Sequence, residues 1–520
     1  MSTSNHEFIL TKIIATLGPA TSEVSDMVEM IENGANVFRV NFSHGELDSF
    51  KILLDNIREA SKRTGHNIGV LADLSGPKFR IGKVAEGGVE LVPGKNVILS
   101  SEDAAQQGDA KTLTVSVNNP IFIPELKVGQ HILLNDGEFV LECSAILNVK
   151  DNPEAQCKVI SGGLLTSDKG INLPDTKLSL PSLTAWDLRC IDFAVEHGFD
   201  FLALSFVRSE KDVQLLKARL RELGARPSMP KRSAGGSGPR FSSYGGGSKS
   251  FIPVMAKIEK PEALDDLESI VDESDIIMIA RGDLGVEMDL AKVPVIQRKI
   301  IKTCHDQGKP VVVATQMLQS MIEAPTPTRA EVSDVANAIL DGAHAVMLSG
   351  ESAVGSFPVE SVKMMRRIAR ETNMYRRSEE IDIVPPRNPR ASRYRTAALA
   401  HGVSVVVRAL DAKLIVMWSQ LGGGASYVSQ MRSSVPVIAL SSNPEALRRM
   451  SILYGLFPFF MDQPESTAAF ILQLDKLLID QKWAQKGDPI VLVLGEPIGQ
   501  EGLTNKIQIH YVGDALARED

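Results

Sequence analysis

Eight short apolar runs recur along the chain, and turn residues bound each of them. The runs are continuous rather than alternating in polarity, which indicates strands buried on both faces, as in a parallel sheet. Segments of helical period lie between them, for example residues 22–34, where Ser22 or Ser25 is expected to cap a helix and Gly34 to end it. The pattern therefore predicts a (β/α)8 barrel, an α/β fold. The runs are residues 12–17, 36–41, 67–73, 200–206, 253–258, 275–280, 310–315 and 343–348.

Two additions accompany the barrel pattern. The third strand is followed by a long insertion in which Asn-Asp-Gly at 135–137 separates two alternating runs, a strong hairpin signal. We expect this insertion to form a small β-barrel domain that acts as a lid above the barrel mouth. After a charged stretch near 375–390, expected to be a linker, further apolar runs predict a C-terminal α/β domain. The expected domains are the barrel at 1–78 and 179–374, the lid at 79–178 and the C-terminal domain at 375–520.

Composition narrows the class of protein. With 43% hydrophobic and 23% charged residues the chain reads as a soluble globular protein, although the Gly, Ser and Pro of residues 226–250 predict a flexible loop. No apolar run suits a membrane span and no export signal begins the chain, so we expect a cytoplasmic protein without membrane contact. The four cysteines are widely separated, which argues against a zinc site or a disulfide framework. A net charge of −8 without a basic block argues against nucleic acid and leaves small molecules as partners.

Charged residues cluster after two of the predicted strands. The string AKIEKPEAL at 256–264 contains Lys257 and Glu259, and IMIARGDLGVE at 277–287 contains Asp283. Mg²⁺ usually takes one or two protein carboxylates, and a lysine beside them can neutralise charge on a transferring phosphoryl group. Taken alone, each string is equally compatible with a surface ion pair or an ordinary turn.

Polar residues also follow the other strands, and in a barrel the carboxyl ends of all strands meet at one mouth. This convergence favours a functional site over separate caps and turns. The additional residues are Arg39, Asn41, Ser43 and His44 after the second strand, Asp73 at the end of the third, Thr315 at the end of the seventh, and Ser349 and Glu351 after the eighth.

Several longer strings point to one family. They are TKIIATLGPATS, RVNFSHG, GPKFRIG, KLSLPSLTAWD, AKIEKPEAL, IARGDLGVE, ATQMLQSM, TRAEVSDVANAILDGAHAVMLSGESAVG and GLTN. Through them the chain resembles the pyruvate kinases over essentially its full length. The resemblance implies a barrel with a lid inserted after the third strand, a C-terminal regulatory domain and a homotetramer. It also implies transfer of the phosphoryl group of phosphoenolpyruvate to ADP, which gives pyruvate and ATP in the last step of glycolysis.

The resemblance assigns roles in binding the phosphoryl donor. Lys257 is expected to stabilise charge on the transferring phosphoryl group and the enolate oxygen, and Arg39 to hold the phosphoryl oxygens. Glu259 and Asp283 are expected to bind Mg²⁺ or Mn²⁺, while the amides around Gly282 and Asp283 face the substrate carboxylate.

The remaining roles concern the proton and the nucleotide. Thr315 is expected near the methylene carbon of enolpyruvate, with the proton arriving through water because a threonine hydroxyl is too weak an acid alone. Asn41, His44 and Arg80 resemble groups that bind the nucleotide. Ser349 and Glu351 are expected to brace the site and to supply protons.

At two places this sequence differs from the family pattern, and each difference predicts a property of the protein. K⁺-dependent members have Glu where this chain has Lys78 and Thr where it has Leu74, beside a cation pocket matching Asn41, Ser43 and Asp73. We expect the ammonium group of Lys78 to serve that pocket, so that K⁺ is not required.

The second departure lies in the C-terminal domain. WSQLGGGASYVSQ at 418–430 resembles an effector-phosphate loop in which three glycines replace the usual hydroxyl-rich run. A sugar-phosphate or nucleotide effector is therefore expected to bind weakly, to differ from the usual one, or to be absent.

Other hypotheses remain at this point. Metal-dependent aldolases share the Lys-x-Glu and downstream Asp pattern but lack the lid and the C-terminal domain. A catalytically dead relative acting as a sensor or scaffold is disfavoured because Lys257, Glu259 and Asp283 occur together. An adhesive protein using Arg281-Gly282-Asp283 is disfavoured by the burial expected at a barrel mouth.

Overall fold

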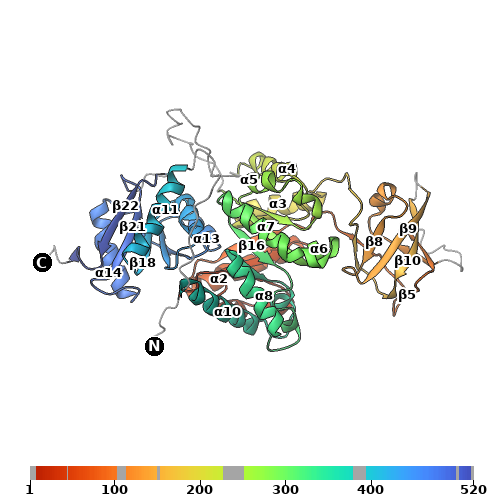
Figure 1. Ribbon diagram of the computed structural model, residues 1–520, viewed down its shortest axis with the longest axis horizontal. Coiled ribbons are helices and arrows are strands. Elements are labelled where there is room, and N and C mark those ends of the chain that lie inside the picture. Colours follow the sequence, from red (N-terminus) through yellow and green to blue (C-terminus); the bar gives the residue numbers. More distant parts are fainter. Residues whose placement is uncertain are drawn as a thin grey trace.

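The computed structural model places a central barrel between a lid domain and a C-terminal domain at opposite ends of the molecule (Figure 1). The described residues are 8–43, 45–101, 113–148, 153–225, 251–378, 394–498 and 503–516. His44, the Gly/Ser-rich segment 226–250 and residues 379–393 of the expected linker region lie outside them.

Eight parallel strands close the barrel in the order β1-β17-β16-β15-β14-β13-β3-β2. Each forms from one of the predicted apolar runs, and most of their side chains are buried on both faces, which confirms the predicted (β/α)8 fold. The strands are β1 Lys12–Thr16, β2 Val37–Asn41, β3 Gly69–Asp73, β13 Phe201–Leu204, β14 Val254–Ile258, β15 Ile276–Ala280, β16 Val311–Ala314 and β17 Ala345–Leu348.

Helices surround the strands, and two helix ends differ from the prediction. The first helix begins at Val24 with Glu23 at its N-cap, so the expected capping by Ser22 or Ser25 is wrong; Ser22 instead ends the short 3-10 helix Pro19–Thr21. Gly34 follows this helix with φ +119°, a conformation that favours glycine.

The barrel helices are α1 Val24–Glu32, α2 Leu47–Thr64, α3 Ala185–His197, α4 Glu210–Glu222, α5 Leu267–Glu273, α6 Arg281–Glu287, α7 Val293–Asp306, α8 Arg329–Asp341, α9 Gly350–Ala353 and α10 Pro358–Ser378. The last of these, α10, continues past position 375, where the sequence suggests a linker.

The lid is a sheet in the order β4-β12-β8-β9-β10-β6-β7, and an antiparallel bridge between Ile81 and Val117 joins its two edges. The predicted hairpin joins β8 to β9, with positive φ angles at Asn135 and Asp136, as a tight hairpin requires. A core of its own holds this domain together. The strands are β4 Phe79–Arg80, β12 Gly170–Asn172, β8 His131–Leu134, β9 Phe139–Asn148, β10 Glu154–Ser161, β6 Asn96–Ser100 and β7 Leu113–Ser116, beside the pair β5 Val89–Leu91 and β11 Gly163–Leu165.

The C-terminal domain is a second α/β sheet in the order β20-β19-β18-β21-β22, parallel except for the antiparallel edge strand β22. Its strands are β18 Leu414–Trp418, β19 Val437–Ser441, β20 Leu456–Phe460, β21 Pro489–Leu494 and β22 Lys506–Tyr511, and its helices are α11 Tyr394–Ala409, α12 Gly423–Gln430, α13 Pro444–Met450 and α14 Thr467–Asp480. In the described part of the chain, no helix is long and apolar enough to cross a membrane.

The C-terminal domain packs on the amino-terminal end of the barrel, opposite the mouth. Arg448 of α13 donates to Asp200, which precedes β13, at 2.8 Å. Lys12, at the start of β1, lies with its ammonium group 3.9 Å from the centre of the Phe457 ring of β20 and is 1% exposed. Burial lowers the pKa of Lys12 from 10.5 to about 7. This interface therefore holds a lysine whose charged form destabilises the folded state.

We predict that Lys12→Met changes how stability depends on pH. The folded-state pKa of Lys12 lies below its unfolded value, so the unfolded chain binds more protons between about pH 7 and pH 10.5, and wild-type stability gains from this group as pH rises through that window. The variant should have the higher urea midpoint at pH 7, and its advantage should shrink towards pH 10; each pKa unit corresponds to about 1.4 kcal/mol.

The matched control is Lys476→Met on the exposed face of α14. A difference between Lys12→Met and wild type that stays constant with pH would contradict the assignment.

Candidate active site

A cavity of about 550 Å³ lies between the lid and the barrel mouth. Lys78, Arg80 and Asp136 line it from the lid side, and Lys260 and Asp283 line it from the barrel side. Of the predicted site residues, Lys78, Arg80 and Asp283 therefore border a space that both domains enclose.

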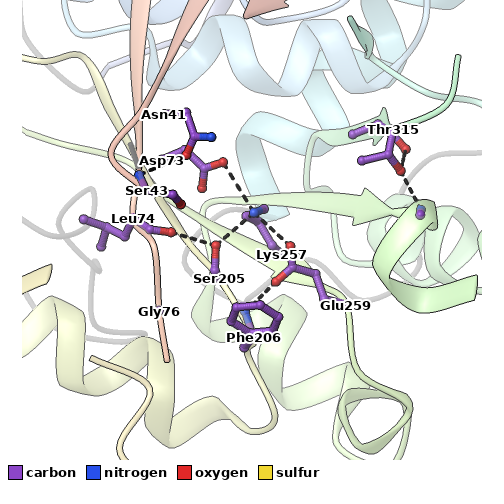
Figure 2. Close-up of polar contacts among 12 residues, drawn as sticks. Asn41, Ser43, Asp73, Leu74, Gly76, Ser205, Phe206, Lys257, Glu259 and Thr315 are labelled. Carbon is purple, nitrogen blue, oxygen red and sulfur yellow. Dashed lines mark hydrogen bonds and ion pairs between the residues drawn. The ribbon is translucent and has the colours of Figure 1, made fainter. Parts of the chain in front are cut away.

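Lys257 is the centre of a buried charge cluster at this mouth (Figure 2). Its ammonium nitrogen lies 2.8 Å from Glu259 Oε1 and 3.4 Å from Asp73 Oδ2, and it donates to Ser205 Oγ at 2.9 Å. Arg39 approaches the same oxygen of Asp73, with Nε at 2.7 Å and Nη2 at 2.6 Å. Side chains from four neighbouring strands or strand ends thus meet in one network.

The charges in this cluster stabilise one another. Burial alone would raise the pKa of Asp73, but Lys257 and Arg39 outweigh it and hold that pKa below its usual value. Burial alone would lower the pKa of Lys257, but Asp73 and Glu259 outweigh it and raise that pKa. Lys257 therefore remains a cation although it is buried.

The pKa of Asp283 is shifted in the opposite direction to that of Asp73. Burial and the neighbouring carboxylate of Glu259 raise the pKa of Asp283 to about 6. Lys78 is partly buried, and burial together with Lys257 lowers its pKa, while Glu259, Asp73 and Asp283 act in the opposite direction. The charges of Lys78 and Asp283 therefore interact with each other and with the charge of Lys257.

Thr315 belongs to a second group of contacts, between β16 and α6. Its hydroxyl accepts from the Gly282 amide at 2.6 Å and donates to the Ala314 carbonyl at 2.6 Å. Arg281 donates to the Thr315 carbonyl at 3.0 Å and pairs with Asp334 at 2.7 Å. Thr315 has φ +69°, which is unusual for a β-branched residue and occurs mainly at functional sites.

Glu351 braces the end of the eighth strand. Its carboxylate accepts from the backbone amides of Ser349 at 2.7 Å and Leu318 at 3.0 Å, and it is completely buried. The Ser349 hydroxyl is buried without a hydrogen-bond partner among the described residues. This geometry supports the predicted bracing role for Glu351, since both carboxylate oxygens are bound to backbone.

The residues expected at the nucleotide and the monovalent cation lie at the edge of the cluster. Asn41 Oδ1 accepts from the Ser43 amide at 3.1 Å, and Lys78 donates to Ser43 Oγ at 3.2 Å. Arg80, on the lid side, donates to the Asp168 carbonyl at 2.9 Å.

Three participants were not predicted from the sequence. Ser205 accepts from Lys257 and donates to the Leu74 carbonyl at 2.7 Å, and the Phe206 amide donates to Glu259 Oε2 at 2.7 Å. Thr16 accepts from Arg39 at 3.1 Å. Because Ser205 and Thr16 follow or end barrel strands, the strand-end rule that identified the other residues could also have found them.

The donor set suits a divalent cation with oxygen ligands. Glu259 and Asp283 are like charges held together in a buried place, and Asp73 Oδ1 has no hydrogen-bond partner among the described residues. A cation would relieve the repulsion that raises the pKa of Asp283. Among the described residues no group of three His, Cys, Asp or Glu side chains is placed to hold a metal.

Two models of known protein families match this chain. The family described as "Pyruvate kinase, barrel domain" matches residues 9–228 and 245–362, and "Pyruvate kinase, alpha/beta domain" matches residues 397–510. The chain belongs to the pyruvate kinase family. The break in the first match falls inside the Gly/Ser-rich segment 226–250.

Individual pyruvate kinases are similar in sequence to this protein over nearly the whole chain. The protein of Mycobacterium intracellulare is 37% identical over 97% of this chain and 98% of its own length. The protein of Geobacillus stearothermophilus is 36% identical over 98% of this chain and 81% of its own length. A crystal structure of a pyruvate kinase from Cryptosporidium parvum superposes with a TM-score of 0.81 at 32% identity, covering 96% of both chains.

Family membership and the structure exclude two of the other hypotheses. A pyruvate kinase has the lid and the C-terminal domain that the aldolases lack. The Arg281-Gly282-Asp283 sequence opens helix α6, and its arginine is paired with Asp334, so it is not an exposed adhesive loop.

Ser205→Ala should lower turnover about tenfold or more, with smaller effects on substrate KM. The Ser205 hydroxyl fixes the position of the Lys257 ammonium group, and a hydrogen bond to a charged group contributes about 1.5–3 kcal/mol. Steady-state kinetics would measure the effect. Ser361→Ala, at an equally buried serine of helix α10, is the matched control and should be close to wild type. Equal kinetics for the two variants would show that Ser205 does not position Lys257.

Proposed function

We propose that this pyruvate kinase transfers the phosphoryl group of phosphoenolpyruvate to ADP and releases pyruvate and ATP. The observation that carries the proposal is the buried Lys257 ammonium group, kept charged by Asp73 and Glu259 beside a cavity that the lid and barrel share. A fixed positive charge in a site shielded from water stabilises charge that develops during phosphoryl transfer.

We assign donor binding to the residues around Lys257. Lys257 faces the transferring phosphoryl group and the enolate oxygen, and Arg39 binds phosphoryl oxygens with its planar fork of donors. The pairing of Arg39 with Asp73 supports this role, because it fixes the orientation of the guanidinium group. The backbone around Gly282 and Asp283 accommodates the substrate carboxylate.

The family implies a divalent metal, and we propose Mg²⁺ or Mn²⁺ held by Glu259 and Asp283. The bound metal ion would neutralise charge on phosphoryl oxygens. The carboxylates themselves orient Lys257 and keep it protonated.

Protonation of the enolate carbon is assigned to the Thr315 side of the site. The Thr315 hydroxyl is fixed by Gly282 and Ala314, so we propose that it orients the water that delivers the proton. Glu351 holds the neighbouring backbone of Ser349 in place. Asn41, His44 and Arg80 are proposed to bind the nucleotide.

The experiment that tests the activity is a coupled assay for pyruvate formation with Lys257→Met. This variant keeps roughly the length of the side chain and removes its charge, so turnover should fall by about 10² to 10³ or more. Binding of Mn²⁺, measured by calorimetry, should largely survive. Lys211→Met, at an exposed position of α4, should behave like wild type. Undiminished turnover in Lys257→Met would remove this lysine from the mechanism.

We also propose that Lys78 replaces K⁺. Its ammonium group donates to Ser43, and the carboxylates of Glu259, Asp73 and Asp283 favour its charged form. A lysine ammonium is a compact single positive charge with three donors, as this position requires.

Activity in Mg²⁺ buffer without K⁺ should therefore lie within a few-fold of that in KCl. The double variant Lys78→Glu, Leu74→Thr should acquire K⁺ dependence, whereas Leu74→Thr alone should not. A wild-type rate that falls by orders of magnitude when a tetraalkylammonium salt replaces KCl would contradict the role of Lys78.

For the effector we propose weak or altered binding at residues 418–430. Helix α12 begins after Gly422, whose φ is +82°, without a side-chain cap. Gly422 and the first two residues of the helix, Gly423 and Gly424, line a cavity of about 500 Å³ between the C-terminal domain and the barrel. Backbone amides remain to bind a phosphate, but few hydroxyl donors do. Titration with fructose 1,6-bisphosphate should give weak activation or none, and tight activation would contradict this assignment.

We further infer a homotetramer in the cytoplasm, from the resemblance to the family. The four cysteines are free and buried, as suits a reducing compartment.

A further inference from the structure

Glu287, at the last position of helix α6, connects three parts of the chain. Its Oε1 accepts from Lys260, which follows strand β14, and from the side-chain amide of Asn172 in lid strand β12 at 2.9 Å. The carboxylate is almost completely buried. A buried carboxylate requires such partners, and one of these partners belongs to the lid.

The opposite end of α6 forms part of the active site. The Gly282 amide donates to the Thr315 hydroxyl, and Asp283 lines the cavity between the lid and the barrel. The helix Arg281–Glu287 is only about 10 Å long at 1.5 Å per residue. Glu287 therefore lies within the same short element as Gly282 and Asp283.

The lid touches α6 at a second place. Gly137, in the hairpin between β8 and β9, packs against Val286, since a Cβ at Gly137 would lie 3.6 Å from its side chain. The neighbouring Asp136 lines the same cavity as Asp283. The lid therefore contacts α6 through both the hairpin and strand β12.

We propose that Glu287 is a positioning residue that couples the lid to helix α6. A ligand in the cleft that fixes the lid would also fix Gly282 and Asp283, and a ligand at those residues would in turn fix the lid. This inference rests on the proposed function, which supplies the two ligands of the cavity that the lid and barrel share. Bound nucleoside diphosphate should increase the affinity for phosphoenolpyruvate, and bound phosphoenolpyruvate should increase the affinity for the nucleoside diphosphate.

Asn172 gives the cleanest test, because Asn172→Ala removes the contact from strand β12 and leaves Glu287 paired with Lys260. Initial rates measured over a grid of both substrate concentrations give the factor by which one substrate lowers the KM of the other. We expect this factor to fall about fivefold or more in Asn172→Ala, at the lower end of typical couplings between sites, while turnover at saturation changes little. Asn172→Asp, which opposes two carboxylates, should reduce it further.

Asn96→Ala, at an exposed lid position of β6, is the matched control and should keep the wild-type factor. An unchanged factor in Asn172→Ala would overturn the proposal. Equal losses of turnover and stability, with the factor intact, would also overturn it, because they would show a merely structural contact.

Hydrogen exchange separates this inference from the proposed activity. Backbone amides of α6 should exchange faster in Asn172→Ala than in wild type and in Asn96→Ala, whether or not the enzyme turns over. A wild-type chain without pyruvate formation would reject the proposed function alone. Identical α6 exchange in all three proteins would reject the coupling alone.

Discussion

The buried position of Lys257 is the constraint on which the rest of the site depends. A lysine ammonium inside a barrel mouth stays charged only if carboxylates and hydrogen-bond acceptors surround it, since removing a charge from water costs several kcal/mol. Asp73, Glu259 and Ser205 provide those partners from three different strand ends. Each partner is held in turn by Arg39, by the Phe206 amide or by the Leu74 carbonyl. The eight parallel strands bring these groups to the same edge, which makes the charge cluster possible.

The active site and the interface with the C-terminal domain lie at opposite ends of the barrel. The mouth meets the lid through Glu287 and the shared cavity, whereas the opposite end of the barrel meets the C-terminal domain through Asp200, Arg448 and Lys12 (Figure 1). The effector-like loop before α12 lines a cavity at that second interface, on the side away from the active site.

The barrel and most of the site were predictable from the sequence because both follow local rules. Continuous apolar runs indicate buried strands, and charged residues at their carboxyl ends indicate the mouth, where Lys257, Glu259 and Asp73 lie together in the structure. The hairpin turn at Asn135 and Asp136 was equally local.

What the sequence did not reveal depends on contacts between distant segments. Ser205 looks like any turn residue until β13 lies beside β14, and the link from Asn172 to Glu287 joins residues far apart in the chain. The cap of α1 was also misjudged, because Ser22 is used by the preceding 3-10 helix.

The central claim is that this charge cluster transfers a phosphoryl group from phosphoenolpyruvate to ADP. The most direct test follows the ³¹P NMR signals of a mixture of the wild-type protein, phosphoenolpyruvate, ADP and Mg²⁺. The account predicts that the phosphoenolpyruvate signal decreases while the γ-phosphate signal of ATP increases in equal amount. Phosphoenolpyruvate that persists, or that is replaced by inorganic phosphate without ATP, would contradict it.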